Sequence, residues 1–242
     1  MWSRLDQTRG LILVFTTLAS LAGCDDRTVN ASDIGAEWFS SPSVSTSRFN
    51  AYSCATCHAV DVDAPAVVPG RLDPGYNLAG APSRGTWWGG GSASLLDAIN
   101  VCVTQFMAGR ALEPEEPRAR LIHAYLAAND FGPATKPTAF TVARNIPLPE
   151  QFTGDPDAGG EIYEAACRRC HGEANTGKGA NSATAVLLPD WPLAMSADRA
   201  REATVDKIRH GRFFNLGGVM PPYSLEAMSD QQIGHLLVFL GL

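Results

Sequence analysis

Apolar residues recur at helical spacing in two well-separated parts of the chain. In "EPRARLIHAYLAAN" the residues on one face are Leu121, Ile122, Tyr125 and Leu126, and in "SDQQIGHLLVFLGL" they are Ile233, Leu236, Leu237 and Leu240. This spacing predicts an amphipathic helix in each place. Ser229 and Asp230 are typical of a helix start, so the second helix is expected to begin there.

Each of these helices closes a series of features that occurs twice. A short helix-like run comes first, in "RFNAYSCATCH" and "AGGEIYEAACRRCH". A loop rich in Gly and Pro follows, and then a longer helix, in "SASLLDAINVCVTQF" and "ADRAREATVDKIRHG". The repeated order indicates two similar domains in tandem. Runs with the alternation of strands are few and short, so an all-α fold is expected.

Changes in composition divide the chain of 242 residues, which is long enough for two small domains. Residues 25–47 are polar and rich in Ser, and the stretch from 131 to 156 contains five prolines, which cannot continue a helix. We therefore expect a leader at 1–23, a polar tether at 24–47, a first domain at 48–130, a Pro-rich linker at 131–153 and a second domain at 154–242.

The leader is expected to direct export. Arg4 and Arg9 precede the apolar run "LILVFTTLASLAG", which is too short for a comfortable membrane span. The run ends in "LAGC", which resembles a bacterial lipobox, in which Cys24 becomes the lipidated first residue of the mature chain. The alternative is an ordinary cleavable signal with Cys24 at this position by chance. The expected product is an exported lipoprotein, anchored in the membrane by its lipid and facing the periplasm.

Composition and charge narrow the possible partners. The chain is 45% hydrophobic and 18% charged, as in proteins that bury a core. Its formal net charge is −6, a poor match to nucleic acid, whose binding depends on Lys and Arg. We therefore expect no nucleic-acid partner.

The strongest chemical signal is Cys-x-x-Cys-His, which occurs as "CATCH" at 54–58 and again, 113 positions later, as "CRRCH" at 167–171. Two thiols at this spacing add to the two vinyl groups of a haem, and the adjacent His binds its iron, so the motif indicates c-type haem attachment. A zinc site would require further Cys or His at knuckle spacing, which neither half supplies. We expect two covalently bound haem c groups, one on Cys54, Cys57 and His58 and one on Cys167, Cys170 and His171.

With these motifs, each half resembles a class I cytochrome c domain. "GGEIYEAACRRCHGEANTGKG" is very similar to the opening helix and first loop of that family, and the resemblance extends over nearly all of residues 48–242. It implies that the opening and closing helices of each half cross behind the haem. By position, it pairs Tyr163 with Phe239 in the second half and Phe49 with Tyr125 in the first.

The second haem has one candidate for its sixth ligand. Met220 lies 49 residues after His171, in "NLGGVMPPYS", where glycines allow the loop to approach and prolines stiffen it. A thioether ligand raises the potential of a haem, and the family typically places a Met before Pro here. The alternative is that Met220 fills a gap in the core.

The first haem has two candidates. Met107 lies 49 residues after His58, and Cys102 lies 44 after it. The stretch "INVCVTQFMAGRAL" resembles the first haem domain of dihaem sulfur-oxidation cytochromes such as the thiosulfate dehydrogenases, which implies a thiolate ligand from Cys102. In a continuous helix the two side chains would point about 140° apart, so only one would face the iron. Both candidates stay open, and Cys102 as a buried free thiol is a third possibility.

Other residues have simpler expectations. Trp87 and Trp88 are expected in the wall of the first haem pocket. Arg168 and Arg169 are expected to be exposed, and His210 to lie at an exposed helix end.

The functional expectation is a membrane-tethered dihaem cytochrome that relays single electrons between other redox proteins or a respiratory membrane complex. No catalytic residue is assigned. The alternative is a thiosulfate dehydrogenase-like enzyme with the first haem as its active site and Arg84 and Arg110 as the nearby cations. A third interpretation is a structural subunit of a respiratory assembly.

Overall fold

The described part of the structure is helical. The computed structural model describes residues 30–63, 70–130, 132, 139–143, 153–185, 196–213 and 218–242. Within these ranges the only β-structure is an isolated bridge between Trp87 and Ser92, so the expected all-α class is confirmed. None of the helices in these ranges is long and apolar enough to cross a membrane. Cys24 and most of the expected linker lie outside the described residues.

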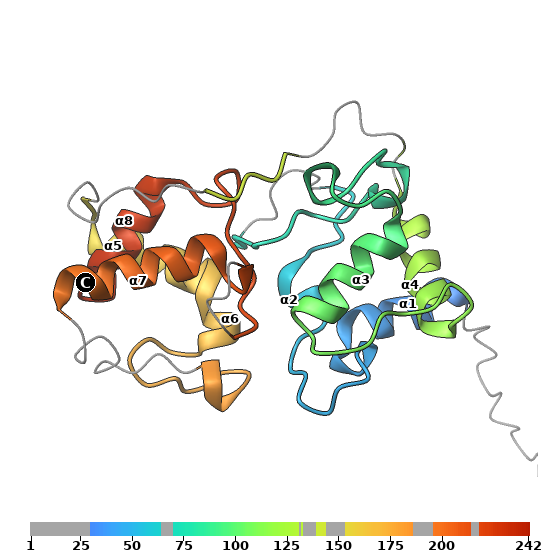
Figure 1. Cartoon of the computed structure of the whole chain (residues 1–242), viewed down its shortest axis with the longest axis horizontal. Coiled ribbons are helices and arrows are strands. Elements are labelled where there is room, and N and C mark those ends of the chain that lie inside the picture. Colours follow the sequence, from blue (N-terminus) through green and yellow to red (C-terminus); the bar gives the residue numbers. More distant parts are fainter. Residues whose placement is uncertain are drawn as a thin grey trace, which may run out of the picture.

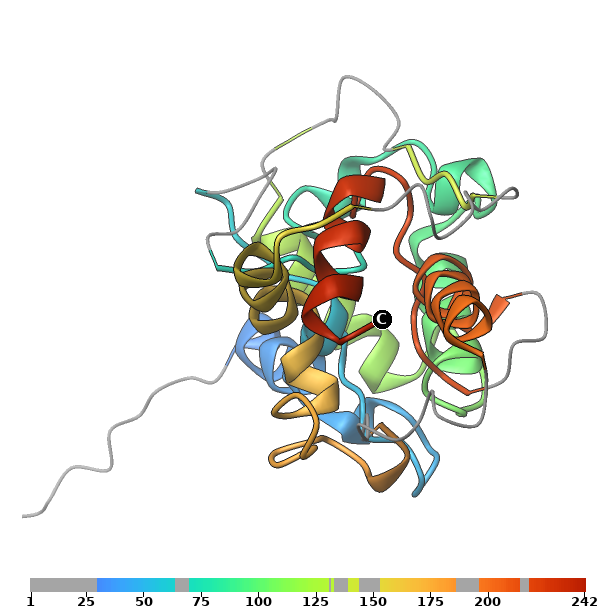
Figure 2. The ribbon, with the colours of Figure 1, turned by 90° about the vertical axis from the view of Figure 1, so that its left-hand side faces the viewer.

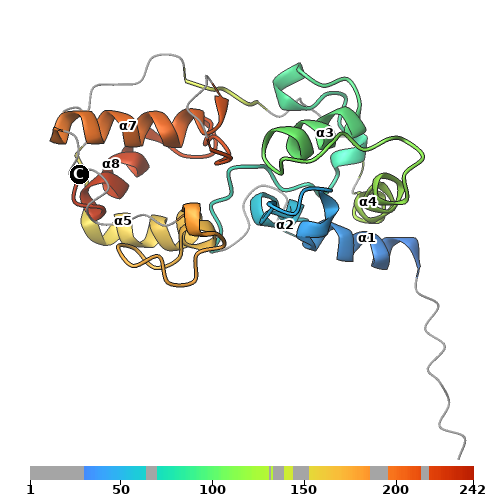
Figure 3. The same cartoon turned by 60° about the horizontal axis from the view of Figure 1, so that its bottom comes forward.

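The helices form two halves that lie side by side, α1 to α4 in one and α5 to α8 in the other (Figure 1). In chain order they are α1 Ala31–Ser40, α2 Cys54–Cys57, α3 Leu95–Gln105, α4 Pro117–Ala128, α5 Pro156–Ile162, α6 Arg168–His171, α7 Ala197–His210 and α8 Asp230–Phe239. A π-helical turn at Tyr163–Cys167 joins α5 to α6. In the second half, α8 lies between α5 and α7 (Figures 2 and 3).

The most extensive contacts between helices are those of α1 with α4 and of α5 with α8. A glycine lies at each crossing. A Cβ atom on Gly35 would come within 2.0 Å of the carbonyl oxygen of Leu121, and one on Gly159 within 2.1 Å of that of His235. The two helix pairs approach this closely only because neither glycine has a side chain.

An aromatic pair stabilises each crossing. One ring of the pair comes from the residue one helical turn after the glycine. Tyr163 and Phe239 have ring centroids 5.5 Å apart in the second half, as expected. In the first half Tyr125 packs against Phe39, with centroids 5.2 Å apart. The expected pairing of Tyr125 with Phe49 is wrong, because the side chain of Phe49 is 81% exposed.

The expectation that residues 24–47 form a polar tether is also wrong for the described part of that segment. Asn30 caps α1 through a reciprocal capping box with Asp33, and Phe39 and Val44 are buried in the core of the first half. Serines around the helix masked its apolar face in the sequence. The recognisable signal is a glycine followed four residues later by an aromatic residue, in "GAEWF" as in "GGEIY" one half later.

The expected opening helix of the first half, "RFNAYSCATCH", is reduced to the single turn α2. The chain from Ser41 to Ser53 connects α1 to that turn, and Pro42 begins a short 3-10 turn directly after α1. The crossing helix and the haem motif are therefore separate elements in the first half, whereas α5, the π-helical turn and α6 form one continuous element in the second.

The closing helices bury the faces that the sequence predicted. In α4 the buried residues include Ile122 and Leu126, and in α8 they include Ile233, Leu236 and Leu237. The predicted start of α8 is confirmed, since the Ser229 side chain accepts a hydrogen bond from the backbone N–H of Gln232. Each half has its own core around its crossing.

Replacing Gly35 by Ala tests whether α1 belongs to the fold. The added methyl group would overlap the backbone of α4, so we expect a loss of about 1–3 kcal/mol in the free energy of unfolding. Alanine also gains about 1 kcal/mol of helix propensity, which opposes this loss. Gly85→Ala is the matched control, because a Cβ there meets no atom within 4 Å. Urea unfolding followed by circular dichroism measures both, and a stabilised Gly35→Ala variant would contradict the crossing.

Candidate haem sites

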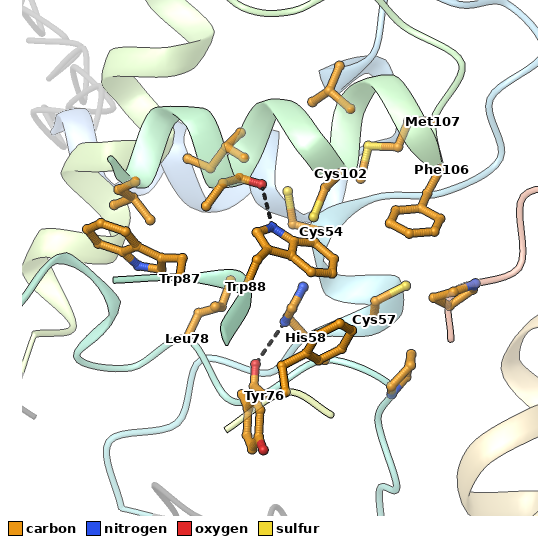
Figure 4. Close-up of a pocket in the computed structure, with 18 of the residues that line it drawn as sticks. Cys54, Cys57, His58, Tyr76, Leu78, Trp87, Trp88, Cys102, Phe106 and Met107 are labelled. Carbon is orange, nitrogen blue, oxygen red and sulfur yellow. Dashed lines mark hydrogen bonds between the residues drawn. The ribbon is translucent and has the colours of Figure 1, made fainter. Parts of the chain in front are cut away.

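The first CxxCH motif lies in the wall of a large, mostly apolar cavity between α2, α3 and the loop from Pro74 to Gly89 (Figure 4). The cavity has an empty volume of about 1180 Å³, part of it open to solvent. Its chemically distinctive lining residues are Cys54, Cys57, His58, Arg84, Cys102 and Met107. Trp87 and Trp88 also line it, as expected. An apolar cavity with a few placed polar groups is typical of a cofactor site.

The histidine of the first motif is held in one orientation. His58 Nδ1 lies 2.8 Å from the carbonyl oxygen of Tyr76, which can only accept, so Nδ1 carries the proton (Figure 4). Nε2 of the neutral ring is then left with a lone pair for a metal. Burial lowers the pKa of His58, with the Tyr76 hydrogen bond opposing it, and this favours the neutral ring.

A glycine makes room for that ring. A Cβ atom on Gly75 would lie 2.1 Å from Cε1 of His58, so any side chain there would displace the imidazole. The adjacent residue, Tyr76, supplies the carbonyl that orients the ring. One short segment therefore both accommodates and orients His58, as expected for a metal-binding histidine.

The two cysteines of the first motif are free thiols in this apolar environment. Burial raises the pKa of Cys54 to about 12 and that of Cys57 well above its ordinary value. Both thiols therefore stay protonated, and neither resembles the low-pKa cysteine of a redox dithiol.

Cys102 and Met107 both line this cavity, although they were expected to point apart. That expectation assumed a continuous helix, but α3 ends at Gln105 and the chain turns at Phe106. Ala108 adopts a left-handed conformation with φ of 49°, and the hydroxyl of Ser45 donates a 2.8 Å hydrogen bond to the carbonyl of Met107. The turn brings Met107 back to the side of the cavity that Cys102 lines.

The second motif lines a second cavity, with an empty volume of about 800 Å³, part of it open to solvent. Cys167, Cys170, His171 and Met220 all face it, so the structure brings together the four residues that the sequence singled out. His171 Nδ1 donates to the carbonyl of Ala185, and burial lowers the pKa of His171. The second histidine is thus oriented and kept neutral in the same way as His58.

The donor sets and surroundings of both cavities fit a covalently attached haem. Each combines two partly buried thiols with a neutral histidine that presents Nε2, and each has a further sulfur side chain in its wall. No cluster of three or more His, Cys, Asp or Glu side chains that could hold a metal ion occurs in the described part of the chain.

Other expectations about polar residues are corrected by the structure. Arg84 lines the first cavity, but Arg110 does not, because it forms an ion pair with Glu116 and its side chain is 55% exposed. His210 is buried, not exposed: Nδ1 lies 2.6 Å from Asp206 Oδ1, and Nε2 lies against the carbonyl of Ala143. These contacts fix the end of α7 rather than supply a haem ligand.

An aromatic cluster at the first cavity could not be recognised from the sequence. Trp88 contacts Phe106, Phe140 and Phe213, with ring centroids 6.2, 5.2 and 6.4 Å away. The four residues come from four distant segments, and Phe213 follows α7 in the other half. The second half therefore completes the surroundings of the first cavity.

The two cavities also share part of their walls. Four residues line both of them: Tyr52, Cys57, Pro74 and Pro221. Pro221 follows Met220 directly, and Pro222 lines the first cavity as well. The loop that carries Met220 into the second cavity thus forms part of the first.

Comparisons with known proteins agree with this chemistry in the second half. Residues 154–240 match the family described as cytochrome C oxidase, cbb3-type, subunit III. Thiosulfate dehydrogenase (TsdBA) from Marichromatium purpuratum, in its as-isolated form, is a similar solved structure, with 15% identity and a TM-score of 0.41. The similarity covers 87% of this chain but 45% of that one. No curated protein matches the chain. The family match makes residues 154–240 similar to a cytochrome c-type domain, which supports covalently bound haem c and a role in electron transfer.

Proposed function

We propose that this protein is a dihaem c-type cytochrome that relays single electrons between redox partners outside the cytoplasm. The observation that carries the proposal is that two cavities of the same design share a wall. Each holds a CxxCH motif, a neutral histidine and a sulfur side chain. Haem bound at both sites would supply reversible one-electron chemistry, and the protein would supply ligands, burial and spacing.

The proposed attachment residues follow the two motifs. Cys54 and Cys57 would hold the first haem and Cys167 and Cys170 the second, with His58 and His171 as the proximal ligands. Met220 is the proposed sixth ligand of the second haem, because its thioether lines the same cavity as His171. The neighbouring prolines stiffen this loop.

We infer that Cys102, rather than Met107, is the sixth ligand of the first haem. Met107 is only 4% exposed and belongs to the hydrophobic core of the first half, so packing already accounts for it. Cys102 lies in the last turn of α3, and its side chain points into the cavity toward Cys54 (Figure 4). Burial raises the pKa of its thiol to about 12, so bound iron would have to drive its deprotonation.

The proposed location is the membrane surface on the periplasmic side, with an acyl anchor on Cys24. The lipobox-like "LAGC" supports this part of the proposal. Lipid anchoring would keep the cytochrome close to a respiratory membrane complex, while soluble redox proteins would reach it from the periplasm.

A second candidate function is favoured by one feature of the first cavity. Cys102 and Arg84 line the same space, so a sulfur ligand and a cation that suits an anionic substrate are found together. In a thiosulfate dehydrogenase-like reaction, two thiosulfate ions would join through a new S–S bond and release two electrons to an external acceptor. The thiolate alone does not make an enzyme, so the relay remains the preferred function.

Haem content is the first test of the relay. Intact-mass spectrometry of the purified full-length protein should show two haem groups that survive acid–acetone extraction, because thioether bonds resist it. Replacing both Cys54 and Cys57 by Ala should leave one haem, since each half has its own motif and core. A wild-type protein with one haem, or none, would refute the dihaem proposal.

Met220→Ala tests the ligand of the second haem. Loss of the thioether should lower the potential of one haem and leave the other nearly unchanged, because a thioether favours ferrous iron. Spectroelectrochemical titration measures both potentials. Met228→Ala is a control for the loss of a methionine from the same half, since Met228 is buried in the core and does not line the second cavity. Equal potentials in wild type and Met220→Ala would place the ligand elsewhere.

Cys102→Ser and Met107→Leu separate the two candidate ligands of the first haem. We expect Cys102→Ser to change the low-spin paramagnetic resonance signal of one haem and Met107→Leu to leave it in place. The reverse result would assign Met107. Thiosulfate oxidation with ferricyanide as acceptor, measured in wild type and Cys102→Ser, then tests the second candidate function. Wild-type activity that disappears in the serine variant would favour the enzyme over the relay.

A further inference from the structure

The two CxxCH motifs are bonded to each other across the boundary between the halves. Arg169, between the cysteines of the second motif, donates from Nη1 to the carbonyl oxygen of Thr56 at 3.0 Å. Thr56 lies between the cysteines of the first motif. The short helices that carry these residues, α2 and α6, face each other where the halves meet (Figure 1).

A carboxylate reinforces this contact. Nη1 of Arg169 lies 2.8 Å from Oδ1 of Asp73, a side chain that is only 10% exposed. Arg71 binds the same oxygen through Nη2, at 2.9 Å, and donates from that atom to the carbonyl of Ala55 at 3.1 Å. Asp73 thus holds two guanidinium groups, and each of them binds a backbone carbonyl between the cysteines of the first motif.

Backbone bonds extend the same junction. The N–H of Leu72 donates to the carbonyl of Ala165 at 3.2 Å. The hydroxyl of Tyr223 lies 2.9 Å from the carbonyl of Ala166 and 3.3 Å from that of Leu72. Leu72 and Asp73 of the first half are therefore bonded to residues that lead into, belong to or contact the second motif, and Arg71 binds Asp73 from within the first half.

At the junction, the second cysteine of each motif contacts the other half. Cys57 lines the cavity of the second motif as well as its own. Cys170 packs against the hydrophobic core of the first half, and Leu72 packs against that of the second. Among the described residues of the two CxxCH motifs, only Cys57 lines both cavities, so this cysteine forms part of the shared wall.

We propose that Asp73 and Arg169 are positioning residues for electron transfer within the chain. They would hold the two motifs together so that one electron could pass directly between haems bound at Cys57 and Cys170. Such a step would oxidise one ferrous haem and reduce one ferric haem, without making or breaking a bond or moving a proton. This inference rests on the proposed dihaem relay. The mechanism that it excludes is one in which each half exchanges electrons only with external partners.

The adjacent arginine provides a matched control. Arg168 occupies the neighbouring position of the same motif, but it pairs within its own half, with Glu164 Oε2 at 2.7 Å, and its side chain is 48% exposed. Arg168→Gln and Arg169→Gln therefore remove the same charge from adjacent positions. Of the two, only Arg169→Gln removes bonds across the junction, those to Thr56 and Asp73.

The experiment uses the full-length holoprotein. Haem content is measured first, and two haems in every variant establish that the sites themselves are intact. Flash photoreduction then delivers less than one electron per molecule, and the absorbance changes follow its redistribution between the two haems. Wild type and Arg168→Gln should show a fast first-order phase whose rate does not depend on protein concentration.

We expect Arg169→Gln to slow that phase by roughly tenfold or more, because small displacements of a positioned reacting group have large effects on rate. Asp73→Asn should act in the same direction, and it replaces Arg169→Gln if that variant loses a haem. Arg169→Lys, which keeps the charge but not the fork of donors, should recover the rate in part.

Two results would overturn the proposal. One is an unchanged rate of the fast phase in the variants Arg169→Gln and Asp73→Asn, when each variant retains two haems. The other is a wild-type redistribution whose rate rises with protein concentration, which would mean that electrons pass between molecules. Neither result depends on the ligand of either iron. A haem count below two in the wild type would instead refute the dihaem relay itself.

Discussion

The structure depends on two helix crossings that leave no space for a side chain. At Gly35 and at Gly159 the facing helix approaches so closely that a single methyl group would overlap its backbone. Each crossing brings an aromatic ring from one helix onto an aromatic ring of the other. These contacts fix the packing of α1 on α4 and of α5 on α8, and the elements that carry the CxxCH motifs are positioned relative to these helix pairs.

The two halves use the same crossing but connect it differently to the motif. In the second half the crossing helix runs through a π-helical turn directly into the cysteines. In the first half a connecting segment separates Phe39 from Cys54. The repeated unit is therefore a helix crossing with its cavity, rather than one uninterrupted helix. The equivalent positions of Gly35 and Gly159 identify this repeat better than the spacing of the two CxxCH motifs does.

Local and periodic signals predicted much of this arrangement. The period of apolar residues gave α4 and α8 with the correct buried faces, and the pentapeptides identified the residues that line both cavities. The apolar face of α1 is not evident from the sequence because polar serines surround it, and the expected pairing of Phe49 with Tyr125 fails because the haem motif does not continue the crossing helix in the first half. The junction of Asp73 with Arg169 could not be predicted, since 96 residues separate the partners and neither belongs to a periodic pattern.

The junction also gives the middle of this acidic protein a local charge of the opposite sign. Arg71 and Arg169 meet one carboxylate, that of Asp73, so these three side chains together carry one net positive charge. The whole chain has a formal charge of −6. The side chain of Arg169 is 38% exposed and that of Asp73 10%, so this small positive centre is partly screened by solvent and acts mainly on its immediate surroundings. A negative charge moving between the two halves would therefore cross the protein at a point where the nearest fixed charges attract it.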